Sequence, residues 1–284
     1  MDYREKFIVE PDSKVRLSKI DPSYTGKQES HDEAIPAIEA NVERLEKLQY
    51  LLYADASQSL LVVLQALDAG GKDGTVRHVF RSMNPQGTSV AAFKQPSREE
   101  ASHDFLWRAH LHAPGKGEVA VFNRSHYEDV LVVRVRELVT RSVWSKRYDL
   151  INDFEKTLSL NGTTIVKFYL HISPEEQLAR FKQRLDDPAR QWKISESDYS
   201  ERELWPQYIE AYEDAIAQTS TKRAPWYIIP ANHKWFRNLA VSQIIADTMD
   251  EMGLKLPPTR VNLAEIRRKY HAAEREAKNN NKKR

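Results

Sequence analysis

The chain has 284 residues, a formal net charge of +2 and no cysteine. A chain of this length buries a full core, as one large domain or two small ones. The missing cysteines exclude disulfides, thiolate chemistry and cysteine metal sites. No stretch approaches the roughly 20 apolar residues of a membrane span, and the first residues lack the apolar region of a signal peptide. We therefore expect a cytoplasmic protein without membrane association.

Charge is distributed unevenly along the chain. Eight Lys and Arg against three acidic residues give segment 265–284 a local charge of +5, so the remainder carries about −3 of the +2 total. This distribution argues against a general nucleic-acid-binding surface and favours local basic sites for a small anion. We interpret 256–284 as a basic tail in which a frayed helix runs into disorder.

The first residues lack periodicity and carry several turn formers. Pro11, Asp21-Pro22 and Gly26 predict that residues 1–30 form an arm or short hairpin lying over the domain. Apolar residues then recur at helical spacing over 35–52, with Pro36 tolerable near the helix start. That stretch predicts a packing helix.

The stretch 60–75, LLVVLQALDAGGKDGT, combines a buried strand with a Gly-rich loop that bears one lysine. Its apolar run has the length of a strand covered on both faces. The following TVRHVFRSM has helical spacing. Strand, loop, lysine and helix together indicate a P-loop, in which backbone N–H groups and a helix N-terminus hold phosphate oxygens.

The match to the P-loop pattern G-x-x-x-x-G-K-[ST] is imperfect. Gly71 and Lys72 agree with it, whereas Ala66 replaces the first glycine and Asp73 replaces the hydroxyl residue. Asp68 lies inside the loop, where phosphate oxygens would repel a carboxylate unless a cation bridged them. We therefore interpret Asp68 as a magnesium ligand. The alternative is an ordinary Gly-rich turn with solvated Lys and Asp side chains.

Strand and helix patterns alternate through the rest of the chain. A charged helical stretch, 173–224, interrupts the alternation like the lid of a nucleotide kinase. This order predicts a three-layer α/β/α sandwich with a five-stranded parallel sheet and its ligand at the carboxyl ends of the strands. The strands are expected at 60–67, 88–93, 119–122, 163–172 and 225–230, and further helices at 97–112, 144–158 and 235–252.

A second carboxylate follows the strand at 119–122. Asn123 stands at the strand end, where an Asp is common in P-loop enzymes, so the metal role plausibly moves to Glu128, beside Asp129. Arg124 is expected to face phosphate at the same edge. Acidic residues also favour helix starts, which leaves a solvated helix start as the alternative.

The charged stretch carries a row of basic residues. Arg180 and Arg184 are four residues apart and share a helix face, and Arg190 and Lys193 follow. Such a row is suited to closing over a phosphate chain. Pairing with nearby acidic residues on a solvated face is the alternative.

Several of these motifs together resemble family 2 polyphosphate kinases. They are ALDAGGKDGTVRHV, the turn NPQG, HDFLWRAH, FNRSHYEDVLVVRV, KFYLHISPEEQ with Trp192-Lys193, and APWYIIPANHKWFRN, over roughly residues 40–250. The stretch SHYEDVLVVRV is similar to the class III branch. The resemblance implies that residues 31–255 form a P-loop kinase fold that carries a helical lid. It also implies that phosphate is transferred between inorganic polyphosphate and AMP, ADP and ATP, and that this transfer depends on magnesium, for which manganese can substitute. It also implies a homo-oligomer, a dimer or a tetramer.

The resemblance assigns roles by position. Asp68, Gly71 and Lys72 fall on the Walker A group, Asn123 and Arg124 on the Walker B edge, and Glu128 on a metal-side acid. Further phosphate-binding positions in and beyond the loop are Ala69, Gly70, Lys72, Asp73, Gly74, Thr75, Arg180, Arg184, Arg190 and Lys193. Arg108 and Asp104 are the candidates for contact with the acceptor nucleotide.

Two other functions fit part of the sequence. An ATP-dependent nucleotide kinase similar to thymidylate kinase shares the P-loop and the lid, but its loop would normally lack Asp68. A non-enzymatic polyanion-binding protein would use the basic tail and lid, and would leave Asp68 and Glu128 without a purpose.

Overall fold

The computed structural model describes residues 2–26 and 30–281, and these fold around one mixed sheet. The order across the sheet is β1-β6-β5-β2-β4-β3, and all neighbours are parallel except β1 and β6. In the described part of the chain the strands are β1 Ile8–Val9, β2 Ser59–Gln65, β3 Thr88–Ala92, β4 Val119–Asn123, β5 Thr163–His171 and β6 Trp226–Pro230.

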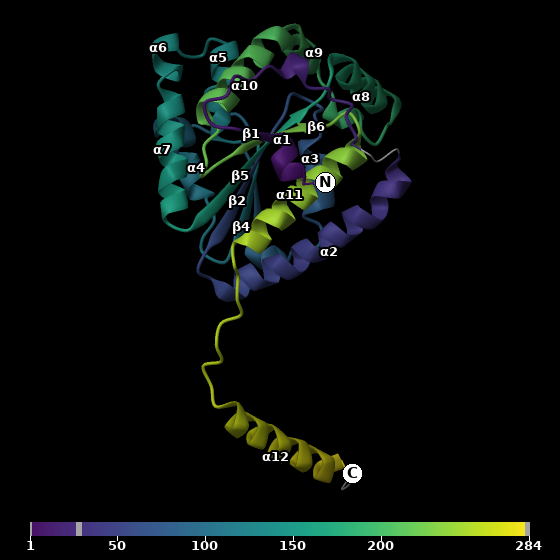
Figure 1. Cartoon of the computed structure of the whole chain (residues 1–284), viewed down its shortest axis with the longest axis vertical. Helices are drawn as coiled ribbons and strands as arrows, with labels where there is room; N and C mark the ends of the chain where they lie inside the picture. Colours follow the sequence, from purple (N-terminus) through teal and green to yellow (C-terminus); the bar gives the residue numbers. More distant parts are fainter. Residues whose placement is uncertain (1, 27–29, 282–284) are drawn as a thin grey trace.

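Helices cover both faces of the sheet and produce the predicted three layers (Figure 1). Leu60, Val62 and Leu64 of β2 pack into one core, while Leu61 and Val63 pack into the other. The first core is covered by α1 Tyr3–Phe7, α2 His31–Asp55, α3 Lys72–Val79 and α11 Lys234–Glu251. The second is covered by α4 Trp107–Leu111, α7 Arg147–Leu160 and α10 Trp205–Thr219.

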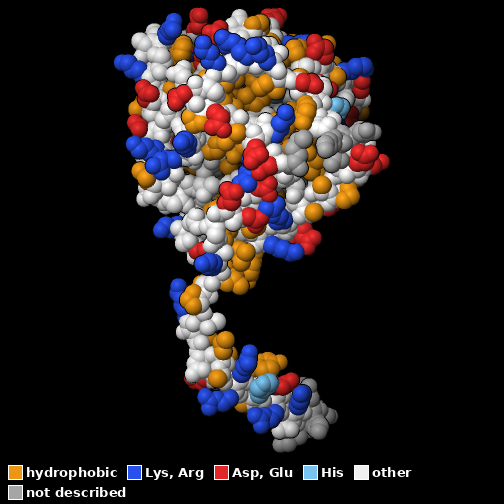
Figure 2. All heavy atoms as spheres, viewed as in Figure 1, with side chains coloured by type: hydrophobic (Ala, Val, Ile, Leu, Met, Phe, Trp, Pro, Cys, Tyr) orange, Lys and Arg blue, Asp and Glu red, His pale blue; other side chains and the backbone are white. Residues whose placement is uncertain are grey.

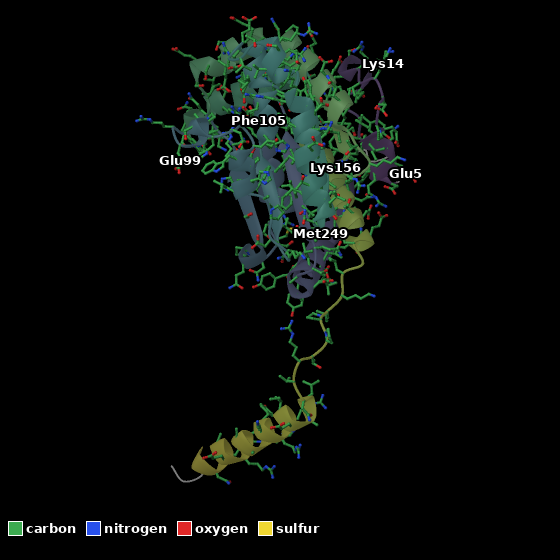
Figure 3. All side chains as sticks on the ribbon, turned by 90° about the vertical axis from the view of Figure 1, so that its left-hand side faces the viewer. Glu5, Lys14, Glu99, Phe105, Lys156 and Met249 are labelled. Atoms are coloured by element: carbon green, nitrogen blue, oxygen red, sulfur yellow. The ribbon has the colours of Figure 1, made fainter. Side chains whose placement is uncertain are left out.

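The outer surface of the second layer faces the viewer in Figure 3, where Lys156 marks α7. Several short helical elements lie in the connections between the strands and the longer helices. They are η1 Leu17–Lys19, η2 Pro85–Gly87, η3 Glu100–Ser102, η4 His126–Asp129, α5 Val132–Val135 and α6 Arg141–Trp144.

The sheet has one strand more than the five we expected, and it comes from the N-terminal arm. Ile8 and Val9 pair antiparallel with Tyr227 and Trp226 of β6. In residues 2–26 the arm therefore pairs with β6 and does not form the hairpin that we considered for it. Met1 and residues 27–29 lie outside the described residues. A strand of two residues is too short to show an alternating hydrophobic pattern, and its partner lies more than 200 residues away in the sequence. No local sequence pattern therefore predicts this strand.

The single helix expected over 97–112 is also wrong. The capping pair forms, because Ser97 N–H donates to Glu100 at 2.6 Å and Glu100 N–H to Ser97 at 3.2 Å. The chain nevertheless becomes extended at His103, and Asp104 Oδ1 accepts a hydrogen bond from Leu106 N–H at 2.9 Å. Asx-type bonds of this kind compete with helix continuation, so the segment splits into η3 and α4.

The stretch expected as a lid insertion has anchored ends and an exposed middle. It contains α8 Pro174–Asp186, η5 Gln191–Lys193, α9 Glu196–Glu203 and α10. α8 buries Gln177, Arg180 and Phe181, and α10 buries a face against α7. Neither η5 nor α9 contains a buried residue. The part of 173–224 that is least held by packing is thus its middle.

The C-terminal tail, which we expected to be a frayed helix running into disorder, contains the helix α12 Leu263–Asn281. Asn262 caps it by accepting from the N–H groups of Ala264 and Glu265 at 3.1 and 3.3 Å. In Figure 1 the helix stands away from the body on an extended linker. Residues 282–284 of the expected tail lie outside the described residues. No helix among residues 2–26 and 30–281 is both long and apolar enough to cross a membrane.

Candidate active site

The Gly-rich loop follows β2 at the centre of the sheet, as the sequence predicts, and opens α3. Gly71 precedes the helix with φ +104°, in the left-handed region that favours glycine. A Cβ added there would lie 2.0 Å from Arg237 Nη1, so any side chain at this position would force the buried Arg237 guanidinium to move. Ala69 also has a positive φ, of 59°. This strained backbone is typical of loops that present N–H groups to a ligand.

Lys72 lies folded over the loop that carries it. Its Nζ donates to Ala66 O at 2.8 Å and to Leu67 O at 3.4 Å, and the residue is only 8 % exposed. Burial, together with the neighbouring Arg124, lowers the pKa of Lys72 to about 8. The ammonium is therefore held by two carbonyls and has no carboxylate ion pair in the described structure.

Asp68, Arg124 and Glu128 converge at the same edge. Arg124 Nη2 lies 2.7 Å from Asp68 Oδ1, and its Nη1 lies 3.5 Å from Glu128 Oε2. Arg124 has φ 60°, an uncommon conformation that occurs directly after β4. Burial raises the pKa of Glu128, against the opposing effects of Arg124 and Lys72. The structure thus brings together the four side chains to which we gave central roles.

Asp68, Arg124 and Glu128 line one pocket together with residues of the lid stretch. Its lining consists of Ala66, Leu67, Asp68, Arg124, Glu128, Leu131, Gln177, Glu201, Trp205, Tyr208 and Tyr212. Glu201 of α9 is fixed by Tyr208, whose hydroxyl donates to it at 2.7 Å, and by Arg136 at 2.7 Å. Three aromatic rings, the amide of Gln177 and one ionic group, Glu201, therefore form the part of the wall that comes from the lid stretch.

The donor set suits a hard divalent cation. Mg²⁺ in phosphoryl-transfer sites takes one or two protein carboxylates and completes its shell with water and substrate phosphates. Asp68 and Glu128 supply two carboxylates in the pocket. Across the described residues there is no group of three or more His, Asp or Glu that could hold an ion without substrate. The residues thus fit a cation that binds together with a phosphate chain.

The second half of the loop is tied to the lid stretch through Asp73. Asn123 Nδ2 donates to Asp73 Oδ1 at 2.9 Å, and Lys193 Nζ donates to Asp73 Oδ2 at 3.3 Å. The hydrogen bond from Asn123 lowers the pKa of Asp73. Asn123 and Lys193 are therefore at the loop, as expected, but both are engaged by Asp73.

The four basic residues of the lid stretch do not form one row. Arg180 is buried, and its guanidinium donates to Ala69 O at 2.8 Å and to the backbone carbonyls of Ala231 and Asn232. Arg184 donates to Lys193 O at 3.1 Å, whereas Arg190 pairs with Asp187 at 2.9 Å. Arg180 thus connects the P-loop to the end of β6, a role that its sequence neighbours do not reveal.

Arg108 and Asp104 lie at the start of α4 in different environments. Arg108 is buried and donates to Lys94 O at 2.8 Å and to Asp129 at 3.5 Å. Asp129 also accepts from Arg147 at 3.1 Å. Asp104 is exposed and caps the local turn. The structure therefore places Arg108 as a support of the Glu128 segment, and brings neither residue into the pocket lining described above.

Sequence reasoning missed Arg237 of α11, which packs against the P-loop glycines. Arg237 is 2 % exposed and bonds only the neighbouring Asn238 side chain, at 2.8 Å, so in the described structure no carboxylate compensates it. Burial and the nearby Arg180 lower the pKa of Arg237 to about 9. The available signal was a lone arginine on the apolar face of WFRNLAV.

A buried polar network beneath η4 was also missed. Lys167 of β5 donates to Glu155 Oε2 at 2.6 Å, to the Tyr127 hydroxyl at 2.9 Å and to Thr219 O at 2.7 Å. Tyr127 in turn donates to Glu155 at 2.8 Å. The network fixes Tyr127, the residue before Glu128. A lysine within the apolar strand TTIVKFYLH was the available signal.

Comparison with known proteins agrees with this arrangement. Residues 28–257 match the family model described as polyphosphate kinase 2. The chain belongs to the polyphosphate kinase 2 family. This confirms the resemblance found in the sequence.

Individual relatives extend over nearly the whole chain. The AMP/ADP-polyphosphate phosphotransferase of Meiothermus ruber is 51% identical over 254 residues, which cover 89% of this chain and 95% of that protein. The ADP-polyphosphate phosphotransferase of Rhodopseudomonas palustris is 44% identical, over 85% and 86% of the two chains. The crystal structure of polyphosphate kinase 2 from Arthrobacter aurescens superposes with a TM-score of 0.92 at 41% identity, covering 96% and 97%.

Proposed function

We propose that this polyphosphate kinase 2 transfers the terminal phosphate of inorganic polyphosphate to AMP and to ADP, reversibly. The observation that carries the proposal is the pocket in which a P-loop carboxylate, Asp68, meets Arg124 and Glu128 beside Lys72. Two relatives whose names include polyphosphate phosphotransfer to ADP, one of them also to AMP, support it.

The reaction needs positioning and charge neutralisation rather than a strong base. An oxygen of the acceptor's phosphate, already ionised, attacks the terminal phosphorus of polyphosphate while the bond from that phosphorus to the bridging oxygen breaks. The new P–O bond lies in the nucleotide, and the shortened chain leaves with the electron pair. Lys72 and Arg124 neutralise phosphate charge, and the loop N–H groups orient the transferred group.

The cation that we propose is Mg²⁺, with Mn²⁺ as a substitute, held by Asp68 and Glu128. When bound, it would neutralise the negative charge of the phosphate oxygens. Arg124 pairs with the carboxylates of Asp68 and Glu128. When a phosphate chain binds, its oxygens offer further hydrogen-bond acceptors to the same guanidinium. The neighbouring Asn123 and loop residues 69–75 complete the phosphate-binding surface in this proposal.

The proposed kinase domain is 31–255, with 173–224 as the lid insertion, in which η5 and α9 close over the pocket while α8 and α10 stay anchored. Arg184, Arg190 and Lys193 then approach the donor chain from the lid. Arg108 acts on the acceptor side by holding Asp129, next to Glu128. We propose a homo-oligomer that acts in the cytoplasm, where the acceptor nucleotides are made.

One assay tests the function. The protein is incubated with AMP, polyphosphate and Mg²⁺, without ATP, and nucleotides are followed by time-resolved chromatography. We expect ADP first and ATP later from the same reaction, because identical phosphate units present the same charge to Lys72 and Arg124. A parallel reaction that starts from ADP should give ATP without a lag.

The other results are equally informative. Accumulation of ADP without ATP at excess donor would overturn the dual-acceptor claim. ADP formed from AMP only when ATP is supplied would favour a nucleotide kinase similar to thymidylate kinase. Polyphosphate binding without any product would favour a polyanion-binding protein.

A further inference from the structure

The tail helix α12 carries an apolar stripe that its own chain leaves exposed. Leu263, Ile266 and Tyr270 are 46, 47 and 62 % exposed, and Ala273 and Ala277 continue the same spacing. These positions follow the alternating three- and four-residue intervals of one helix face. Most helical stability in proteins comes from packing such a face. The stripe therefore calls for a partner surface.

The linker keeps α12 away from its own body. Lys255 N–H donates to Asp55 Oδ2 at 3.0 Å, and this is the last hydrogen bond between the tail and the body in the described structure. Pro257 and Pro258 follow, and consecutive prolines favour an extended chain. Figures 1 and 3 both show the helix separate from the body. The hydrogen bonds and ion pairs that residues 256–281 form in the described structure stay within the tail.

A groove that matches the stripe lies where the tail leaves the body. It is lined by Glu46, Lys47, Gln49, Tyr50, Leu51, Ser82, Asn84 and Leu256. Tyr50 and Leu256 are 63 and 61 % exposed, and Tyr53 on the same helix is 48 % exposed. Figure 2 shows hydrophobic side chains gathered at this end of the body, beside the root of the tail. The groove thus offers apolar contact area beside one acidic and one basic side chain, Glu46 and Lys47, which balance each other in charge.

We propose that α12 docks in this groove of a second copy of the chain, and that the exchange is reciprocal. Segment 265–284 carries +5 and the remainder about −3, so tail and body attract each other. Because Leu256 lines the groove, a two-fold axis near the two tail roots brings each helix to the other copy's groove. Pairing of two tails is disfavoured, since both are basic and the stripe is shorter than the three or four heptads typical of a coiled coil.

The alignment with the Arthrobacter aurescens structure agrees with a structural role for the tail. It covers 96% of this chain, whereas residues 1–252 make up only about 89%, so the match continues past α11. The tail is thus a feature that a second member of the family shares in part. The proposal deepens the proposed homo-oligomer by naming the surface that forms it.

The first test measures the mass of the full-length protein by light scattering across a concentration series. The wild type should contain at least two chains. The double variant Ile266→Asp/Tyr270→Asp should raise the dissociation constant by about a hundredfold or more, because two large apolar side chains lose their buried environment. The matched control, His271→Asp/Ala272→Asp, adds the same charge outside the stripe and should keep the wild-type mass.

The second test uses the absence of cysteine. A Tyr50→Cys protein is mixed with a larger, tagged Ile266→Cys protein and oxidised, and the products are separated by size. A mixed disulfide should form, and it should be largely absent when Arg268→Cys, on the opposite helix face, replaces Ile266→Cys. Neither the mixed disulfide nor the mass depends on catalysis. Both results would therefore stay the same if the protein proved to have no phosphotransferase activity.

Three results would overturn the proposal. They are a monomeric wild type, a stripe variant that keeps the wild-type mass, and the absence of a mixed disulfide between the Tyr50→Cys and Ile266→Cys proteins. Binding of the wild-type monomer to anionic lipid vesicles that is lost in the stripe variant would instead assign α12 to a membrane surface.

Discussion

At the residue scale, the pocket is defined by how its charges are compensated. Asp68 and Glu128 share Arg124, whereas Lys72 and Arg237 have no carboxylate partner in the described structure. Buried charges without a counter-ion are costly to a folded protein. Their presence beside a P-loop is accounted for by a polyanionic substrate that supplies the missing negative charge.

The two carboxylates should be required independently of folding. Asp68→Asn and Glu128→Gln keep size and polarity but remove negative charge, so each should lower kcat by on the order of a hundredfold or more and shift the Mg²⁺ dependence. Rates are measured over a Mg²⁺ titration, with Asp186→Asn on the exposed end of α8 as the matched control. A normal rate with normal Mg²⁺ dependence would remove the substituted residue from the site.

The depressed pKa of Lys72 predicts an alkaline limit to activity. The ammonium is the form that neutralises phosphate, and with a pKa of about 8 it is lost as pH rises through that value in the free enzyme. The kcat/KM for polyphosphate should therefore fall above about pH 8. At saturating donor the bound polyanion favours the charged form, so kcat should fall only at higher pH. Identical pH profiles for both parameters would contradict this role.

Arg237 should show opposite effects on stability and activity. Arg237→Met removes an uncompensated buried charge and keeps the volume, so the free energy of unfolding should stay equal or rise, within about 1–4 kcal/mol. The KM for polyphosphate should rise, because positive potential behind the loop is lost, while the KM for AMP changes little. Denaturant unfolding and steady-state kinetics give both values, and Arg237→Lys should retain most donor affinity. A destabilised variant with normal kinetics would make Arg237 purely structural.

At the element scale, η4 depends on a buried ion pair between β5 and α7. Lys167→Met leaves Glu155 and Tyr127 without their cation, and breaking such a pair costs roughly 3–5 kcal/mol. We expect that loss in denaturant unfolding. Lys156→Met on the exposed side of α7 is the control and should unfold like the wild type. A Lys167→Met protein of normal stability would show that the pair contributes nothing net.

The elements with a strong local pattern were predicted correctly, and those fixed by distant partners were not. The apolar run at 60–67 and the Gly-rich loop after it predicted β2 and the P-loop, because a continuous apolar run and a high glycine content can be read from the local sequence. β1 escaped because its pairing with β6 is non-local, and 97–112 split because Asp104 engages Leu106. In the site, Asp68 and Glu128 could be proposed from spacing, whereas the contacts of Arg180 and Arg237 come from segments far apart in the chain.

At the scale of the whole molecule, the separation of a basic tail from an acidic body makes assembly sensitive to salt. Screening shortens the range of attraction to about 3 Å at 1 M ionic strength, from about 10 Å at 0.1 M. The rate of association should therefore fall when salt is raised, while dissociation, which is governed by the apolar stripe, changes less. Stopped-flow mixing of labelled chains measures both rates. Equal salt effects on the two rates would contradict this division.

The position of β2 in the sheet also determines when the chain can fold. Leu60 pairs with Val119 and Ser59 with Thr163, so the central strand gains its second neighbour only after β5 has been synthesised. At ribosomal speeds of 5–20 residues per second, that wait lasts roughly 5–20 s. Until β4 has been synthesised, the run LLVVL is an apolar strand with two open edges, and from then until β5 emerges it keeps one. An open apolar edge is the kind of segment that aggregates or is bound by chaperones. We therefore expect the yield of folded enzyme in a cell to depend on how this strand is protected during translation, before any phosphate is transferred.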